Sequence, residues 1–93
     1  MNEPHPPPTG PTLIDWSGWW IETRCRCRVT FLPVRLLAER YGPNAHVAHV
    51  AQRLRCSHCH EHPTMRMVDD PRGLDEFGAA AYGPAHVVPV PTP

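Results

Sequence analysis

Thr23-Arg24-Cys25-Arg26-Cys27-Arg28 and, further along, Arg55-Cys56-Ser57-His58-Cys59 are the two stretches that decide the fold of this 93-residue chain. They carry all four of its cysteines, as two close pairs. Structural metal sites are commonly built in this way, with two pairs of ligands from distant parts of the chain closing a tetrahedron. The second pair has the common C-x2-C spacing. In the first pair, residues i and i+2 of a strand point to the same side, about 6.6 Å apart at ~3.3 Å per residue, so inward-leaning thiolates can share one ion.

A structural metal also suits the size of the chain. A protein of 93 residues buries too little apolar surface to be comfortably stable through a core alone, and small domains often add disulfides or a metal.

The first residues, Met1 to Pro6, do not form a basic start followed by an apolar run, so we expect no secretory signal. No stretch approaches the ~18 apolar residues of a membrane-spanning helix. We therefore expect a cytoplasmic protein without a membrane role, in which the cysteines are metal ligands rather than disulfides.

Several alternatives to a four-cysteine zinc site are open. The cysteines could be free thiols, disulfides, or ligands of iron or another metal. A thioredoxin-like redox function is disfavoured, because that chemistry is expected near a βαβ pattern, whereas this C-x2-C lies between an expected helix and a terminal strand. His58, His60 or His62 could replace one cysteine ligand. His46 and His49 share one helical face, where a solvated polar surface is favoured over a second metal site.

Proline divides the chain into three parts. Ten of the 13 prolines lie within residues 1–12 or 70–93, which we interpret as disordered or extended Pro-rich tails around a folded domain of residues 13–69. Within that domain, residues 19–31 alternate between apolar and polar side chains, which predicts one strand or two strands joined near the cysteines. Odd positions through Phe31 would form an apolar face with both thiols, opposite a stripe of arginines.

Two helices and a last strand complete the predicted α+β domain. Val34, Leu37, Ala38 and Tyr41 have helical spacing after Pro33, and Gly42-Pro43 is a stop signal. A second helix, capped by Asn44, would carry Val47, Val50, Ala51 and Leu54 on its apolar face. Residues 64–68 alternate again and predict a strand. Antiparallel strands would thus surround two short helices inserted between the cysteine pairs.

These features resemble small uncharacterised bacterial proteins of the zinc-ribbon type, which have a cysteine pair, a leucine-rich helical insert and a terminal C-x2-C. The matching stretches are residues 23–28, 33–42 and 53–59, about half of the chain. The resemblance implies that Cys25, Cys27, Cys56 and Cys59 bind Zn²⁺ in a ribbon-like domain, but it implies no single activity. In this class a glycine commonly follows the second cysteine of a knuckle, whereas Arg28 and His60 stand there in this chain.

Charge and aromatic residues indicate a binding function. Residues 22–66 have a net charge of +5 and residues 69–76 a net charge of −3. Four cysteines close the coordination shell, and no catalytic motif accompanies them, so we expect no enzyme.

The leading hypothesis is a zinc-stabilised module that binds a protein partner, partly through apolar residues of the C-terminal segment, such as Phe77 and Tyr82. The alternative is nucleic-acid binding through an arginine-rich strand face and nearby tryptophans, with Trp16 a further ring. The candidate contacts are Arg24, Arg26, Arg28, Arg66, Trp19 and Trp20.

Overall fold

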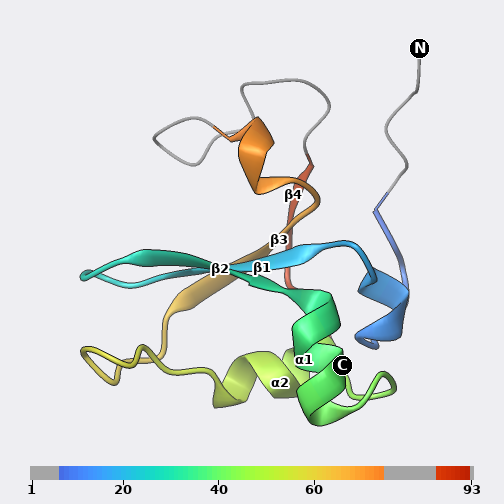
Figure 1. The fold of residues 1–93 in the computed structure, drawn as a ribbon, viewed down its shortest axis with the longest axis horizontal. Coiled ribbons are helices and arrows are strands. Elements are labelled where there is room, and N and C mark those ends of the chain that lie inside the picture. The colour runs from blue at the N-terminus through green and yellow to red at the C-terminus, as the bar shows by residue number, and fades with distance from the viewer. Residues whose placement is uncertain (1–6, 75–85, 93) are drawn as a thin grey trace.

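The computed structural model describes residues 7–74 and 86–92, and these form an antiparallel sheet with two helices on one side (Figure 1). Its strand order is β2-β1-β3-β4. The α+β class and the position of both helices between the cysteine pairs are confirmed. The elements in chain order are η1 (Ile14–Trp16), β1 (Trp20–Arg24), β2 (Val29–Pro33), α1 (Val34–Tyr41), α2 (Val47–Arg53), β3 (Thr64–Val68), η2 (Pro71–Gly73) and β4 (Val87–Pro89).

The core lies between the helices and one face of the sheet. Ile21 of β1 and Met67 of β3 are directly opposite each other and are both fully buried. The helical spacing places Val34 and Leu37 of α1 on the face that packs against them, as predicted. The remaining buried members of this core are Leu13, Trp16, Val47 and Val50. No helix in the described ranges is long and apolar enough to cross a bilayer.

The alternation of residues 19–31 does not continue unchanged through the hairpin. β1 pairs with β2 in a register that sets Ile21 opposite Leu32 and Glu22 opposite Phe31. Directly opposed residues share a face, so the core side passes from odd positions in β1 to even positions in β2. The predicted common face of odd residues is therefore wrong for β2, because the four-residue turn at 25–28 shifts the parity.

The second helix begins later than its predicted cap. His46, rather than Asn44, is the N-cap residue of α2, and its side chain makes no capping hydrogen bond. A backbone N–H of the first turn has a hydrogen-bond acceptor far away in the sequence, since the Val47 N–H donates to the Pro11 carbonyl at 2.8 Å. Leu54, predicted on the apolar face of this helix, has an extended backbone just beyond it and is half-buried.

Parts of both proline-rich ends belong to the fold, in contrast to the predicted tails. The Val47 N–H donates to the Pro11 carbonyl, and the indole N–H of buried Trp16 donates to the Gly10 carbonyl at 2.8 Å. At the other end, β4 pairs with β3, and Val88 packs against the core. The domain boundaries at residues 12 and 69 therefore cut through hydrogen-bonded structure. Residues 1–6, 75–85 and 93, which include Phe77 and Tyr82, lie outside the described part.

Candidate metal centre

The first cysteine pair is held by the β1–β2 hairpin. β1 ends at Arg24 and β2 begins at Val29, so the turn between them consists of residues 25–28. The Cys25 N–H donates to the Arg28 carbonyl at 3.1 Å, which closes the turn. Both thiols therefore project from a hairpin end whose position is fixed by the sheet.

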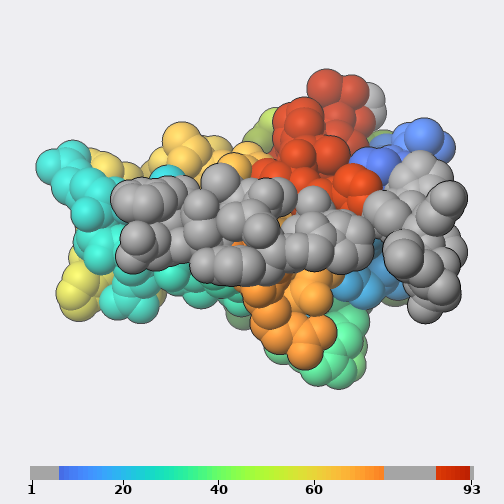
Figure 2. Space-filling view, turned by 90° about the horizontal axis from the view of Figure 1, so that it is seen from above, coloured from blue at the N-terminus to red at the C-terminus, as the bar shows by residue number. Residues whose placement is uncertain are grey.

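The second cysteine pair lies in a loop that ends beside this hairpin. Figure 1 shows the turn and the loop after α2 at the same end of the molecule, and Figure 2 shows this from a second direction. The Cys56 N–H donates to the Glu61 carbonyl at 3.0 Å, and the His60 N–H donates to the Cys56 carbonyl at 2.8 Å. The His58 N–H points at the Cys56 sulfur, 3.4 Å away. Backbone hydrogen bonds thus shape this loop around a thiolate.

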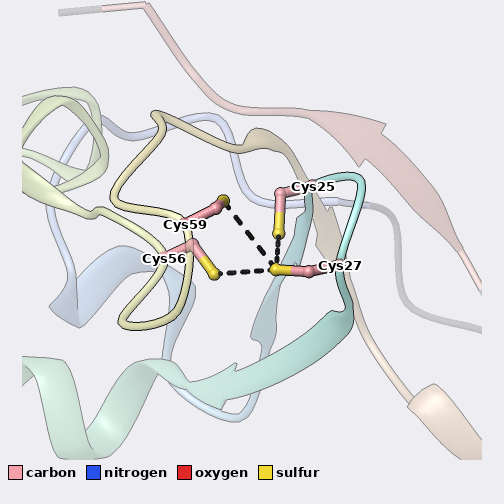
Figure 3. A group of neighbouring side chains, drawn as sticks. All are labelled: Cys25, Cys27, Cys56 and Cys59. Carbon is pink, nitrogen blue, oxygen red and sulfur yellow. Dashed lines mark hydrogen bonds between the residues drawn. The ribbon is translucent and has the colours of Figure 1, made fainter.

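All four sulfurs converge on one point (Figure 3). The Sγ atom of Cys27 lies 3.1 Å from that of Cys25, 3.2 Å from that of Cys56 and 3.8 Å from that of Cys59. The four ligand atoms all lie within 4.8 Å of one another. Four thiolates at ~2.3 Å from a tetrahedral zinc ion are about 3.8 Å apart, so the cluster has the dimensions of a four-cysteine metal site. All four cysteines are free thiols.

The thiols of the cluster differ in pKa. The backbone N–H of Cys59, followed by the Cys27 thiol and the His58 N–H, lowers the pKa of Cys56 to about 6. The thiols of Cys25 and Cys56, together with burial, raise the pKa of Cys27 to about 12. Hydrogen bonds thus favour the thiolate form of Cys56, whereas the neighbouring thiols favour the protonated form of Cys27. A divalent cation would remove this competition, because coordinated thiols are deprotonated.

An ion pair joins the two loops next to the sulfurs. Arg26 lies between the first two cysteines, and its guanidinium contacts the carboxylate of Glu61, two residues after the last one. Hydrogen bonding to Glu61 raises the pKa of Arg26 further, and the negative charges of Cys59 and Cys27 add to the effect. The guanidinium therefore compensates thiolate charge at the centre. Sequence reasoning missed the role of Glu61, although its position beside the C-x2-C motif was a usable signal.

The histidines near the second pair do not join the cluster. Among the described residues, the candidate metal-binding group consists of the four cysteines alone. The His62 ring nitrogen Nε2 lies 3.1 Å from the Ala51 carbonyl oxygen and is engaged there. His46 and His49 stack on each other at 5.1 Å, without a third ligand in the described cluster. The geometry supports cysteine in all four ligand positions.

His60 stands where a knuckle favours glycine. Its φ of 61° makes it the one non-glycine residue with positive φ in the described ranges, so the predicted left-handed turn is present after Cys59. Arg28, in the equivalent place after Cys27, has no positive φ. A side chain in this conformation costs about 1–2 kcal/mol.

Replacing His60 with glycine is expected to stabilise the metal-loaded protein by about 0.5–1 kcal/mol. Glycine removes the left-handed strain, and its larger chain entropy in the unfolded state offsets part of the gain. Urea unfolding at a fixed zinc concentration measures the difference. Ser57→Gly, in the same loop, is the matched control and should lose about 0.5–1 kcal/mol, because that position has no positive φ to relieve. Equal losses for both variants would contradict this explanation.

The predicted nucleic-acid contacts are dispersed rather than collected on one face. Arg26 and Arg28 lie in the hairpin turn, outside the strands. Arg24 and Arg66 lie on the sheet face away from the helices, where both contact Glu22. Glu22 is 2% exposed, and its role was missed by sequence reasoning, which placed it on the strand face that carries the arginines.

The tryptophans are also separated from one another. Trp16 is buried, so its ring is unavailable for stacking on bases. Trp19 packs edge-on against Trp16, with ring centroids 4.9 Å apart, and belongs to the margin of the core. Trp20 lies on the opposite face, and the tryptophans therefore form no common stacking platform with the hairpin arginines.

Comparison with known proteins adds no family assignment. No family model, no curated protein and no solved structure matched this chain. Any functional assignment must therefore come from the geometry of the site.

Proposed function

We propose that the cysteine cluster is a zinc-ribbon-like structural site that holds one Zn²⁺. The observation that carries this proposal is the convergence of four sulfurs from two distant loops to within 4.8 Å. Zinc suits a tetrahedral all-thiolate site better than the harder cations that prefer oxygen ligands. A closed shell of four protein ligands has no open position for substrate, so its contribution is to join the hairpin to the loop that follows α2.

We further propose that the stabilised domain is a non-enzymatic module that binds a protein partner. The charges of the sheet support this choice, because Arg24 and Arg66 are paired with Glu22 and Arg26 is paired with Glu61. A phosphate group would have to compete with these carboxylates for the guanidinium groups. The aromatic residues are likewise divided between the core and the far face of the sheet.

Nucleic-acid binding is the alternative, and two exposed arginines favour it. Arg28 and Arg55 are exposed near the metal centre, and no carboxylate within the described ranges pairs with either. Together they line a hollow of about 190 Å³ between the hairpin and the second cysteine loop. Two cations at the rim of a hollow can contact phosphates, but they can equally offset the charge of about −2 on a zinc–thiolate centre.

The proposed function is tested by partner capture with protein of known metal content. Elemental analysis should first find one zinc ion per chain. The immobilised zinc-loaded protein is then exposed to cell extract with and without nuclease treatment, alongside protein stripped of zinc by a chelator. We expect a protein to be retained by the loaded form alone. Absence of stoichiometric zinc would overturn the metal assignment, and retention that disappears with nuclease treatment would overturn the protein-binding assignment.

A titration with Arg28→Gln/Arg55→Gln separates the two uses of these arginines. If they contact phosphates, the affinity for duplex DNA should fall, and the slope of log K against log salt should flatten by about 0.9 for each lost contact. If they offset thiolate charge, zinc retention against a chelator should weaken and DNA binding should be absent in both proteins. We expect the second result. Arg35→Gln/Arg40→Gln, on exposed positions of α1, is the matched control.

A further inference from the structure

Trp20 and Phe31 are aromatic residues on the sheet face that points away from the core. Trp20 lies opposite Pro33 and Phe31 lies opposite Glu22 in the β1–β2 register, so the two rings occupy diagonal positions on one face. Both are half-buried, and neither belongs to the core cluster. Aromatic rings that are partly exposed and lie outside the core can contact a ligand.

A hollow of about 580 Å³ lies beside these rings. β3 brings acidic residues to it, because Val68 pairs with Trp20 and the chain continues directly into Asp69 and Asp70. The following turn, η2, lies on the opposite side of the sheet from α1 and α2 (Figure 1). The described residues that line the hollow include Gly18, Trp20, Phe31, Asp69, Asp70 and Arg72. Its volume is within the range of ligand-binding clefts.

The two carboxylates that line the hollow, those of Asp69 and Asp70, already have partners within the chain. The Asp70 carboxylate accepts two hydrogen bonds from the Arg72 guanidinium, at 3.1 and 3.2 Å. The Arg72 side chain is 91% exposed, so little else holds its guanidinium in place. Asp69 accepts from the backbone N–H of His86 and also lies 3.0 Å from its ring. Arg72 thus shows that a guanidinium fits on Asp70 at the rim of the hollow.

We propose that this hollow binds the cationic side chain of a lysine or arginine in an extended segment of a protein partner. Aromatic faces attract cations through their quadrupole, and a carboxylate supplies a charge-assisted hydrogen bond. The two occur together here, because Trp20, Phe31 and Asp70 line the same hollow. Arg72 occupies Asp70 in the free protein and is displaced when the partner's cation binds. The inference rests on the proposed function, since it requires a protein partner.

The chemistry is tested with three blocked tripeptides, Ala-Lys-Ala, Ala-Arg-Ala and Ala-norleucine-Ala. Norleucine has the aliphatic length of lysine without its charge. Binding to the zinc-loaded full chain is followed by NMR titration of the Trp20 indole N–H and by calorimetry. We expect both cationic peptides to bind and the norleucine peptide to bind at least about tenfold more weakly. Equal binding of all three peptides, or no binding of either cationic peptide, would overturn the proposal.

Two variants of the same ion pair should change affinity in opposite directions. Arg72→Ala removes the internal competitor and should strengthen binding of Ala-Lys-Ala several-fold. Asp70→Asn removes the charge that attracts the ligand but keeps an oxygen for the Arg72 N–H, and should weaken binding by about tenfold. Both lose the same ion pair, so a purely structural role would shift them alike. Shifts in the same direction would refute the displacement model.

Phe31→Leu tests the aromatic contribution and should weaken binding about tenfold at unchanged zinc content. Arg35→Ala is the matched control, because Arg35 is exposed on α1, across the sheet, and should leave affinity unchanged. Failure of these peptides while the loaded protein still captures a nuclease-resistant partner would reject this site alone. Failure of partner capture itself would reject the proposed function, irrespective of the tripeptide results.

Discussion

Replacing Cys56 with serine is expected to release the metal ion and unfold the domain. Cys56 is the most buried of the four cysteines, and its sulfur lies 3.2 Å from that of Cys27 at the meeting point of the two loops. In small domains, metal binding and folding are one equilibrium, with apparent binding free energies of about 10–16 kcal/mol for structural zinc. That exceeds most of the ~5–15 kcal/mol by which folded proteins are stable. Elemental analysis and thermal melting by circular dichroism measure the two losses together.

Ser57→Ala is the matched control for this experiment. Ser57 is an exposed neighbour of Cys56 in the same loop, so its replacement should keep both zinc and the melting temperature. A Cys56→Ser protein that retains one zinc ion and melts like the wild type would show that a histidine such as His58 replaces the lost ligand. That result would contradict the four-cysteine assignment.

The residues of α1 show which part of the fold could be predicted from the sequence. Val34 and Leu37 recur with helical period after a proline, and this local pattern coincides with the buried face in the structure. Local backbone preference and tertiary burial agree there, so the sequence pattern was sufficient. The cysteine pairs were equally informative, because the spacing of metal ligands within each pair is a local property of the sequence. The convergence of the two pairs follows from the positions of the hairpin and of the loop after α2.

Features that depend on distant contacts were missed. β4 lies in a segment that reads as a tail, because Pro89 and its neighbours interrupt any strand pattern. β4 is an edge strand, where a proline is tolerated, and β3 supplies its hydrogen-bonding partner. The start of α2 was missed for a related reason, because the Val47 N–H is satisfied by Pro11, far away in the sequence.

The charges around the site were also misjudged from local pattern. In a strand, alternation places Glu22 and Arg24 on the same face, but it does not show which residues of a neighbouring strand lie beside them. β3 places Arg66 directly opposite Glu22, so a residue predicted to extend the arginine stripe forms an ion pair with a buried carboxylate. Only the strand pairing reveals this, because the two residues are 44 positions apart.

The Glu22–Arg66 pair leads to the second large expected effect. Two hydrogen bonds, at 2.8 and 2.9 Å, join the guanidinium to a carboxylate that is 2% exposed. Arg66→Met would leave that carboxylate buried with the more distant Arg24 at 3.7 Å, and should destabilise the zinc-loaded protein by about 3 kcal/mol. This is the low end of the range for buried pairs, because the Arg66 side chain is 33% exposed.

A double-mutant cycle distinguishes this pairing from a general packing effect. Glu22→Leu/Arg66→Met removes both charges together, so it should lose at least about 2 kcal/mol less than the sum of the two single variants. Arg24→Met is the control and should lose less than about 1 kcal/mol, since its side chain is 45% exposed. Urea unfolding at saturating zinc gives all four values. Additive losses across the cycle would mean that Glu22 is stabilised by other groups, and that β1 and β3 are held together mainly by their hydrogen bonds and the buried Ile21–Met67 contact.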